Sequence, residues 1–315
     1  GIYNAWISFD DLALANQLSF YLLIFILGLF ILENLSRKKA QYHSPSKGGF
    51  KKKSLTTLYG LKAWLAFSFC FLVFFISFLF PVLQMLYWTV IFPKHLADLN
   101  LFELFSNTII LVLLSSIVLI GFAFISNYGN RLSRSKFLEI LTTFSISGYA
   151  IPGIILAVAF ITFISWFDNN IINLFEIRNI KSIFIGSILG LVIVYFIRFY
   201  SLASNGIKSG YLKINYSIDE SAYLLGYSKF KTFKNIHIPY LKNSIMLIGI
   251  LIGIEIIKEL PITLIMRPFN FETFATQAYI FASQDLLEAA AAPSLFLILT
   301  ASFFILITSR YTLKD

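Results

Sequence analysis

Two carboxylates stand out in an otherwise apolar part of the chain. Glu255 and Glu259 are four residues apart, so on a helix they would share one face, with Lys258 beside them. Ionisable groups in or near a membrane span are costly and usually face a cavity or a partner. Glu255 comes about 14 residues after the expected start of its helix, which places it roughly 21 Å deep. Both are candidates for lining a polar pathway, Glu255 more so, or they pair with Lys258 or a neighbouring helix and only fix the packing.

The chain has none of the short motifs that would carry catalysis. It contains no Gly-x-x-x-x-Gly-Lys-Ser/Thr phosphate loop, no Gly-x-Ser-x-Gly and no His-Glu-x-x-His. His43, His95 and His237 are far apart in the sequence, and we expect His95 and His237 to be polar surface residues. Cys70 is the single cysteine, which excludes a disulfide within the chain and disfavours a zinc cluster. We therefore expect neither an enzyme nor a resident metal or cofactor.

The composition is that of an integral membrane protein. Of the 315 residues, 58% are hydrophobic and only 13% are charged, against about 25% charged in soluble domains. A span of about 20 apolar residues crosses a hydrocarbon core of about 30 Å, and only helices or closed barrels satisfy their backbone there. The long apolar runs do not alternate strictly. They predict an all-α, polytopic transmembrane helical bundle in a lipid bilayer.

The basic residues indicate how the bundle is oriented. The net charge is +9, which raises the question of a nucleic-acid partner. All but five of the 25 lysines and arginines fall on the loops and helix ends of one side; the exceptions are Lys94, Arg178, Lys181, Lys258 and Arg267. This asymmetry follows the positive-inside rule and identifies the cytoplasmic face. We expect no nucleic-acid partner.

The predicted spans cover residues 12–34, 63–91, 107–126, 138–166, 183–200, 241–260 and 289–308. We expect Pro81 to interrupt the second span, and Gly148, Pro152 and Gly153 to bend the fourth. Residues 167–182 are expected outside the membrane. Residues 267–288 are too polar to span and are expected to form an external surface helix.

A polar segment, residues 219–239, separates the spans at 183–200 and 241–260. It carries Lys229, Lys231 and Lys234 and lies on the basic side. Its pattern predicts two short helices on the membrane surface, with Gly226 ending the first and Pro239 opening the next membrane helix. Small residues at Ser221, Ala222 and Gly226 would let another surface approach the backbone. The alternative is an ordinary amphipathic connector.

This segment resembles the EAA loop of bacterial ABC importer permeases. The resemblance rests on six positions and departs from the family pattern at Ser221 and Ile238; the six are Glu220, Ser221, Ala222, Gly226, Ile236 and Pro239. It implies a type I ABC importer permease fold in the inner membrane of a bacterium. It also implies that the loop couples transport to two separate cytoplasmic ATPase subunits.

A second stretch resembles the ferric-iron importer permeases, which are fusions of two permease halves. The matching residues are Lys258-Glu259-Leu260-Pro261, Arg267-Pro268-Phe269, and Phe274-Ala275-Thr276 ahead of Tyr279. This resemblance implies ferric iron as the substrate and a soluble periplasmic binding protein that delivers it. Related permeases serve thiamine, phosphonates and other small solutes. An ion-gradient transporter or a membrane-embedded enzyme is disfavoured, because the spans hold few acids.

The domain organisation follows from this resemblance and from a loose internal similarity. Residues 2–22 resemble residues 278–298, with Tyr3 matching Tyr279, and both segments lead to a Ser-Arg pair. We therefore expect residues 1–36 to be the last transmembrane helix of a preceding permease half, so that the chain begins inside a longer protein. Residues 37–62 would be a basic cytoplasmic linker, and residues 63–315 a six-helix permease domain.

Overall fold

The computed structural model describes residues 1–39 except 8 and 10, residues 57–133, 147–174 and 184–312, and single residues between 134 and 146. The longer helices are α2 (Leu12–Lys39), α3 (Leu61–Phe74), α4 (Phe80–Ile91), α6 (Leu101–Ser133), α8 (Gly153–Leu174), α9 (Ile188–Tyr211), α12 (Ile238–Ile257) and α15 (Leu287–Thr312). The shorter ones are α1 (Ile2–Ile7), α5 (Pro93–Ala97), α10 (Tyr216–Leu224), α11 (Lys229–Thr232), α13 (Pro261–Met266) and α14 (Phe274–Ser283). Two π-helical turns, η1 (Phe75–Leu79) and η3 (Phe233–His237), and a 3-10 turn, η2 (Ser147–Ala150), complete the described elements.

Seven helical segments of the described chain are long and apolar enough to cross a membrane. They are Leu12–Leu29, Leu61–Ile91, Leu101–Ser133, Gly153–Ile171, Ile188–Tyr211, Lys229–Ile257 and Leu287–Ser309. The predicted count of seven spans is confirmed for the described residues. The all-helical bundle is confirmed for the described residues as well.

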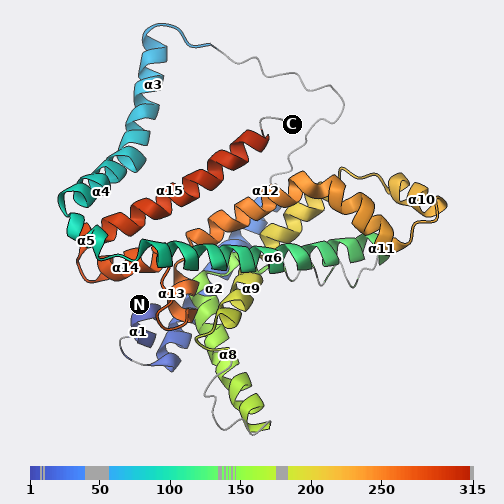
Figure 1. Ribbon diagram of the computed structural model, residues 1–315, viewed down its shortest axis with the longest axis horizontal. Coiled ribbons are helices and arrows are strands. Elements are labelled where there is room, and N and C mark those ends of the chain that lie inside the picture. Colours follow the sequence, from blue (N-terminus) through green and yellow to red (C-terminus); the bar gives the residue numbers. More distant parts are fainter. Residues whose placement is uncertain are drawn as a thin grey trace.

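The centre of the bundle is built from α6, α9 and α12. Helix α9 packs against both of the others, and α12 also contacts α15 (Figure 1). The rings of Tyr195 and Phe199 on α9 are completely buried. A Cβ atom at Gly206 of α9 would lie 2.5 Å from Ile248 Cγ1 of α12, so a side chain there would displace the Ile248 side chain or the helices themselves. Small residues at such contacts allow close packing between membrane helices, where lipid gives little hydrophobic drive for association.

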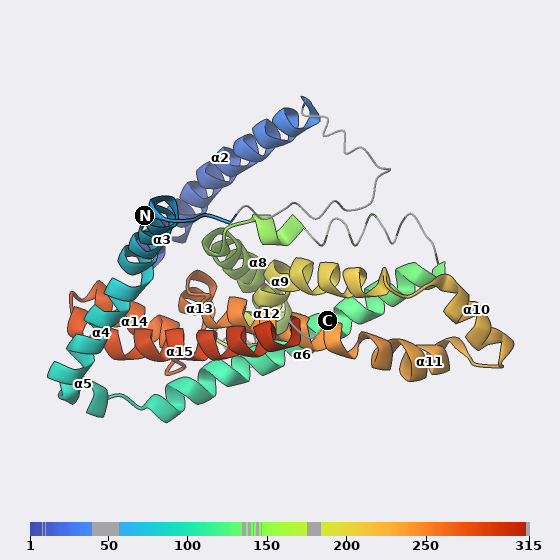
Figure 2. The same cartoon turned by 90° about the horizontal axis from the view of Figure 1, so that it is seen from above.

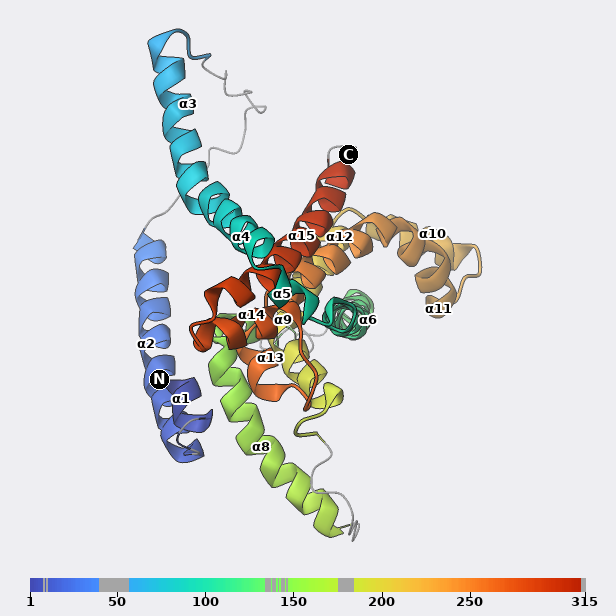
Figure 3. The ribbon, with the colours of Figure 1, turned by 60° about the vertical axis from the view of Figure 1, so that its left-hand side comes forward.

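Two peripheral parts flank this centre. Along α3, η1 and α4 no residue is buried; α3 stands away from the bundle, while α4 contacts α15 (Figures 2 and 3). Helix α2 packs on α8, where the Asn16 side-chain amide donates a 3.0 Å hydrogen bond to Thr162 Oγ1. The Tyr3 and Tyr279 rings, matched in the internal similarity, meet edge to face at 5.8 Å.

The expected interruption at Pro81 is wrong, because the helix continues through it. Pro81 has no N–H to donate, and its ring would clash with the carbonyl of Ser77 in a regular α-helix. The π-helical turn η1 widens the helix just before the proline, and Phe80 N–H bonds to Phe75 O, five residues back. Such a turn accommodates the proline without breaking the rod.

The fourth predicted span, residues 138–166, is placed too early. Most of residues 134–146 lie outside the described part, and α8 begins only at Gly153, directly after Pro152. The residue before a proline is disfavoured in helical conformation, which explains the late start. At its other end α8 runs to Leu174, into the segment expected outside, where Asp168 is buried.

The predicted surface helix at residues 267–288 is also wrong in part. Helix α14 occupies its middle, but Phe274, Ala275 and Thr276 are buried and the helix packs on α15 and α6. The Thr108 hydroxyl of α6 accepts a 3.4 Å hydrogen bond from Phe274 N–H. In the predicted linker, residues 40–56 lie outside the described part, and residues 37–39 belong to α2.

Candidate functional site

The loop between α9 and α12 lies at one end of the bundle, opposite α5 and α14 (Figure 1). It begins with α10, whose N-cap Asn215 accepts a hydrogen bond from Ser217 N–H. Gly226 ends α10 as predicted, with φ of 81°. Gly226 N–H donates to Tyr223 O and Tyr227 N–H to Ala222 O, both at 3.0 Å. This pair of bonds is a Schellman motif, in which glycine carries no steric penalty for left-handed backbone.

The second predicted short helix is not a separate element. Ser228 caps α11 by accepting from Lys231 N–H at 3.2 Å, and α11 continues through η3 into α12. Pro239 stands in the first turn of α12, but the helical rod already begins at Lys229. The π-helical turn precedes this proline as η1 precedes Pro81, so the proline is again accommodated without a break.

The loop residues predicted from the sequence differ in their exposure to solvent. Glu220, Ser221, Gly226 and Pro239 are exposed, while Ile236 is half-buried. Ala222 is buried against the bundle, so the expectation that it presents backbone to another surface is wrong.

Three apolar side chains project beside the exposed loop residues. Leu224, Leu225 and Phe230 are 89%, 78% and 72% exposed. We call them the apolar tip. Exposed apolar side chains set among polar residues are a feature of surfaces that bind another protein.

A buried carboxylate, Asp219, lies on α10, and it was not among the residues predicted for this site. Asp219 Oδ2 is 2.6 Å from Arg131 Nε of α6, and Asp219 Oδ1 is 2.7 Å from His237 Nε2 of η3. The expectation of a surface histidine at position 237 is wrong, because this side chain is 0% exposed. The available signal was an aspartate directly before Glu220 and a histidine between two isoleucines.

The guanidinium of Arg131 holds more than the carboxylate. Its Nη1 and Nη2 atoms donate 3.1 Å hydrogen bonds to the carbonyls of Ile214 and Asn215, which connect α9 to α10. It also lies 4.3 Å from the centre of the Tyr216 ring. The planar fork of arginine suits such a multiple contact.

Aromatic rings enclose the histidine. The ring centres of Tyr128 and Tyr211 are 5.2 and 5.4 Å from that of His237. The Tyr128 ring also lies 4.8 Å from the Phe233 ring, tilted by 37°, and its hydroxyl donates a 2.6 Å hydrogen bond to Lys229 O. Helix α6 is thereby fastened to the start of the rod that contains α12.

The two carboxylates of the other candidate stretch do not share a helix face. Helix α12 ends at Ile257, so Glu259 lies in the break before α13. Glu255 is half-buried and pairs with Lys258 at 2.7 Å. Glu259 is buried and pairs with Arg198 of α9 at 3.3 Å. The pairing alternative considered for these residues is thus present, with different partners for each.

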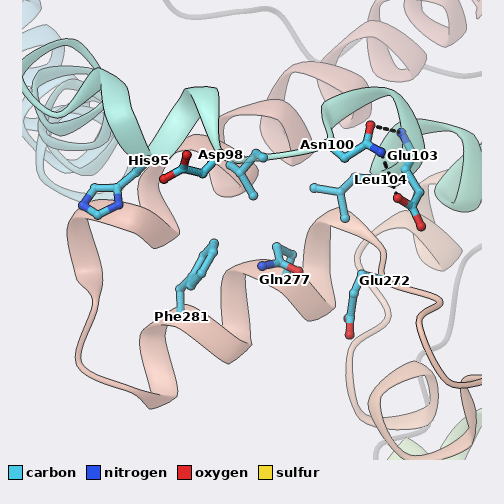
Figure 4. A pocket seen from close by; sticks show the side chains of 9 residues that line it. His95, Asp98, Asn100, Glu103, Leu104, Glu272, Gln277 and Phe281 are labelled. Atoms are coloured by element: carbon cyan, nitrogen blue, oxygen red, sulfur yellow. Dashed lines mark hydrogen bonds between the residues drawn. The ribbon is translucent and has the colours of Figure 1, made fainter.

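A hollow of about 290 Å³ lies at the end of the bundle opposite the loop. His95, Asp98 and Glu103 line it from the α5 and α6 side, and Glu272 and Gln277 from the α14 side (Figure 4). His95 is half-buried at this site. Over the described ranges, no three His, Cys, Asp or Glu side chains are grouped so that they could hold a metal ion.

No protein-family model matches the chain. It is 22% identical over 280 residues to the Fe(3+)-transport system permease protein FbpB 2 of Haemophilus influenzae, covering 88% of this chain and 53% of that protein. The chain therefore spans about half the length of the curated relative it matches.

Two solved structures share the fold. One is a bacterial ABC transporter involved in the import of the acidic polysaccharide alginate, with a TM-score of 0.61 and 16% identity over 80% of this chain and 96% of that one. The other is a bacterial alginate ABC transporter in complex with an alginate pentasaccharide-bound periplasmic protein, with a TM-score of 0.63 and 15% identity over 78% and 93%. Together with the seven apolar helices, this likeness shows a multi-pass membrane protein with the fold of ABC importer permeases.

Proposed function

We propose that this chain is the transmembrane permease subunit of a binding-protein-dependent ABC importer in a bacterial inner membrane, and that its substrate is ferric iron. The observation that carries the coupling role is the exposed surface of the loop after α9. There, Glu220 lies on the same short helix as Leu224, and the apolar tip is open to a partner. Such an apolar core with a polar rim is the usual anatomy of a protein interface.

The proposed partner at this surface is a cytoplasmic ATPase subunit. The loop lies on the side that carries most of the lysines and arginines, which is the cytoplasmic side by the positive-inside rule. Glu220, Ser221 and Gly226 would contact the partner directly, with Ile236 and Pro239 shaping the start of the following rod. ATP would be hydrolysed in the partner, and this chain would move the substrate.

The proposed substrate rests on the likeness to a ferric-iron permease and on the chemistry of the candidate pathway. Ferric iron is a hard cation that prefers oxygen ligands. Glu255 offers a half-buried carboxylate at the end of α12, where Lys258 is its present partner. The periplasmic binding protein would coordinate iron tightly. Glu255 would contact the ion only transiently during translocation, and Glu259 would be the next carboxylate on the pathway.

The proposed assembly has two permease halves and two ATPase subunits. The curated relative is about twice as long as the part that matches this chain. Residues 1–36 would be the end of the preceding half, residues 37–62 the linker and residues 63–315 the second half. The packing of α2 on α8 is compatible with this division.

Uptake of labelled ferric iron tests both parts of the proposal. Vesicles would contain the full-length permease, its ATPase and the iron-loaded binding protein, with thiamine and a phosphonate as competitors. We expect ATP-dependent iron uptake that Glu220→Ala abolishes and that Glu288→Ala, at the opposite end of the bundle, preserves.

The outcomes separate the substrate from the coupling role. If thiamine or the phosphonate suppressed the uptake of iron, the chain would still be an importer permease, but ferric iron would not be its substrate. Normal uptake in Glu220→Ala would remove the coupling role from the loop. Uptake without ATP would instead favour a transporter driven by an ion gradient.

A further inference from the structure

We infer that Asp219 is a positioning residue that ties the docking helix α10 to two membrane helices at once, so that movement of α10 reaches both. This inference rests on the proposed function, because it assigns how the docked loop transmits force. The structural basis is the contact of one buried carboxylate with Arg131 of α6 and with His237 at the start of the α12 rod.

Helix α10 is attached to the bundle by several side chains: Ile218 packs against the core, and the Tyr216 ring lies 4.3 Å from the Arg131 guanidinium. Of its nine residues, only Asp219 and Ala222 are buried. Ala222 contributes a methyl group, whereas Asp219 contributes two charge-assisted contacts of 2.6 and 2.7 Å. Such contacts are roughly twice as strong as neutral hydrogen bonds. Asp219 therefore makes the strongest polar contacts between α10 and the bundle, and each of the two goes to a different membrane helix.

The two carboxylate oxygens are divided between the two helices. Oδ2 faces Arg131, and Oδ1 faces His237. An ionised carboxylate only accepts hydrogen bonds, so the Nε2 atom of His237 carries the proton in this contact. Asparagine has one acceptor and one donor in place of these two oxygens, and both partners present donors. Asp219→Asn keeps the shape of the side chain but removes its negative charge, so both contacts lose their charge assistance, and a hydrogen bond to His237 survives only if the imidazole changes tautomer.

Substitutions of His237 can distinguish a positioning role of its hydrogen bond to Asp219 from a role in packing alone. The ring is completely buried between Tyr128 and Tyr211. Glutamine at position 237 keeps a nitrogen donor at about the reach of Nε2, whereas leucine fills a similar volume without a donor. A packing role predicts that His237→Leu performs at least as well as His237→Gln, and the positioning role predicts the reverse.

The first experiment measures distances in the full-length permease by spin labelling. Ser217 on α10, Asn243 on α12 and Ile125 on α6 are exposed and lie outside the network, so cysteines there carry the labels. Cys70 is exposed and is replaced by serine. We expect narrow α10–α12 and α10–α6 distance distributions in the parent. Asp219→Asn should broaden at least one of them, and His237→Leu should broaden α10–α12 alone.

The second experiment measures ferric iron taken up per ATP hydrolysed, and binding of the ATPase subunit. For Asp219→Asn and His237→Leu we expect this ratio to fall about fivefold or more, the usual lower range of a coupling effect. His237→Gln should retain most of the uptake per ATP. All three variants should still bind the ATPase subunit. Asp168→Asn is the matched control: Asp168 is 1% exposed and accepts a 3.1 Å hydrogen bond from Phe184 N–H, far from the loop along the chain.

Several outcomes would overturn the inference. The first is that the distance distributions stay unchanged in Asp219→Asn. The second is that His237→Leu and His237→Gln take up the same amount of iron per ATP hydrolysed. The third is that Asp168→Asn lowers this ratio as much as Asp219→Asn does. Failure of the proposed function has a different signature, because the parent itself then shows no ATP-dependent iron uptake. The distance measurement needs neither ATPase nor substrate, and it still decides whether Asp219 positions α10.

Discussion

Arg198 Nε lies 3.3 Å from Glu259 Oε2, so an ion pair joins the middle of α9 to the break between α12 and α13. The same guanidinium donates a 3.0 Å hydrogen bond to Ile151 O, just ahead of α8. Glu259 Oε1 accepts a 3.3 Å hydrogen bond from Ile262 N–H in the first turn of α13. One ion pair thus organises three segments that are far apart in the sequence.

Removing one partner of this pair should destabilise the protein. Glu259→Ala leaves the arginine without its counter-charge in a largely buried site, which costs about 3 kcal/mol in comparable proteins. Thermal unfolding in detergent measures the loss. The double variant Arg198→Met/Glu259→Leu should recover most of the stability, because it leaves no unpaired charge. A double variant no more stable than Glu259→Ala would show that the backbone contacts matter more than the charge.

Gly226→Ala should loosen the loop. The residue has φ of 81°, and a non-glycine residue in left-handed backbone costs about 1–2 kcal/mol. Hydrogen exchange at the amides of α10 should therefore become faster. Gly129→Ala in α6 is the matched control, since both glycines have open space around them and Gly129 is helical. That control should leave exchange in α10 unchanged; faster exchange in both variants would contradict a local effect.

Leu224→Ser should weaken binding of the ATPase subunit without unfolding the permease. The side chain is almost fully exposed, so the free protein loses little packing. A central interface residue typically contributes about 2 kcal/mol, which corresponds to roughly a 30-fold loss of affinity. Titration of the purified subunits measures it. Phe269→Ser is the control, because this ring is 100% exposed at the other end of the bundle. Equal losses in both variants would argue against the apolar tip as the docking surface.

Glu255→Gln should lower ferric-iron uptake while stability stays nearly constant. Its ion pair with Lys258 is half-exposed, and exposed pairs contribute about 0–1 kcal/mol. A carboxylate on the pathway, however, would offset the cost of moving a cation through an apolar medium. Lys258→Gln breaks the same pair but keeps the carboxylate, so it should preserve uptake. Normal uptake in Glu255→Gln would show that the Glu255–Lys258 ion pair only stabilises the packing and that Glu255 has no role on the pathway.

The sequence predicted the features that depend on local pattern. The apolar runs gave the seven spans because a helix must bury about 20 residues to cross the bilayer. Gly226 predicted the end of α10 because few other residues adopt left-handed backbone without cost. Both features are decided within a few residues of the chain.

Features that depend on long-range contacts were missed or misplaced. Arg131 and Asp219 are 88 residues apart in the sequence, and nothing near either residue indicates that they meet. His237 looked like a surface residue because the enclosing tyrosines come from α6 and α9. The placement of Glu255 and Glu259 on one face is a different case, because Pro261, which opens α13, is a local signal that α12 ends ahead of it, at Ile257.

The π-helical turns before Pro81 and Pro239 also bear on how such chains tolerate changes in length. A π-helical turn holds one residue more than the α-helical turn it replaces. A chain that lacks one residue between Phe233 and His237, and has another residue in place of Pro239, would close this turn into regular α-helix, with the start at Lys229 and the end at Ile257 still joined by one rod. A one-residue gap in an alignment at this place is therefore compatible with the same architecture on both sides of it.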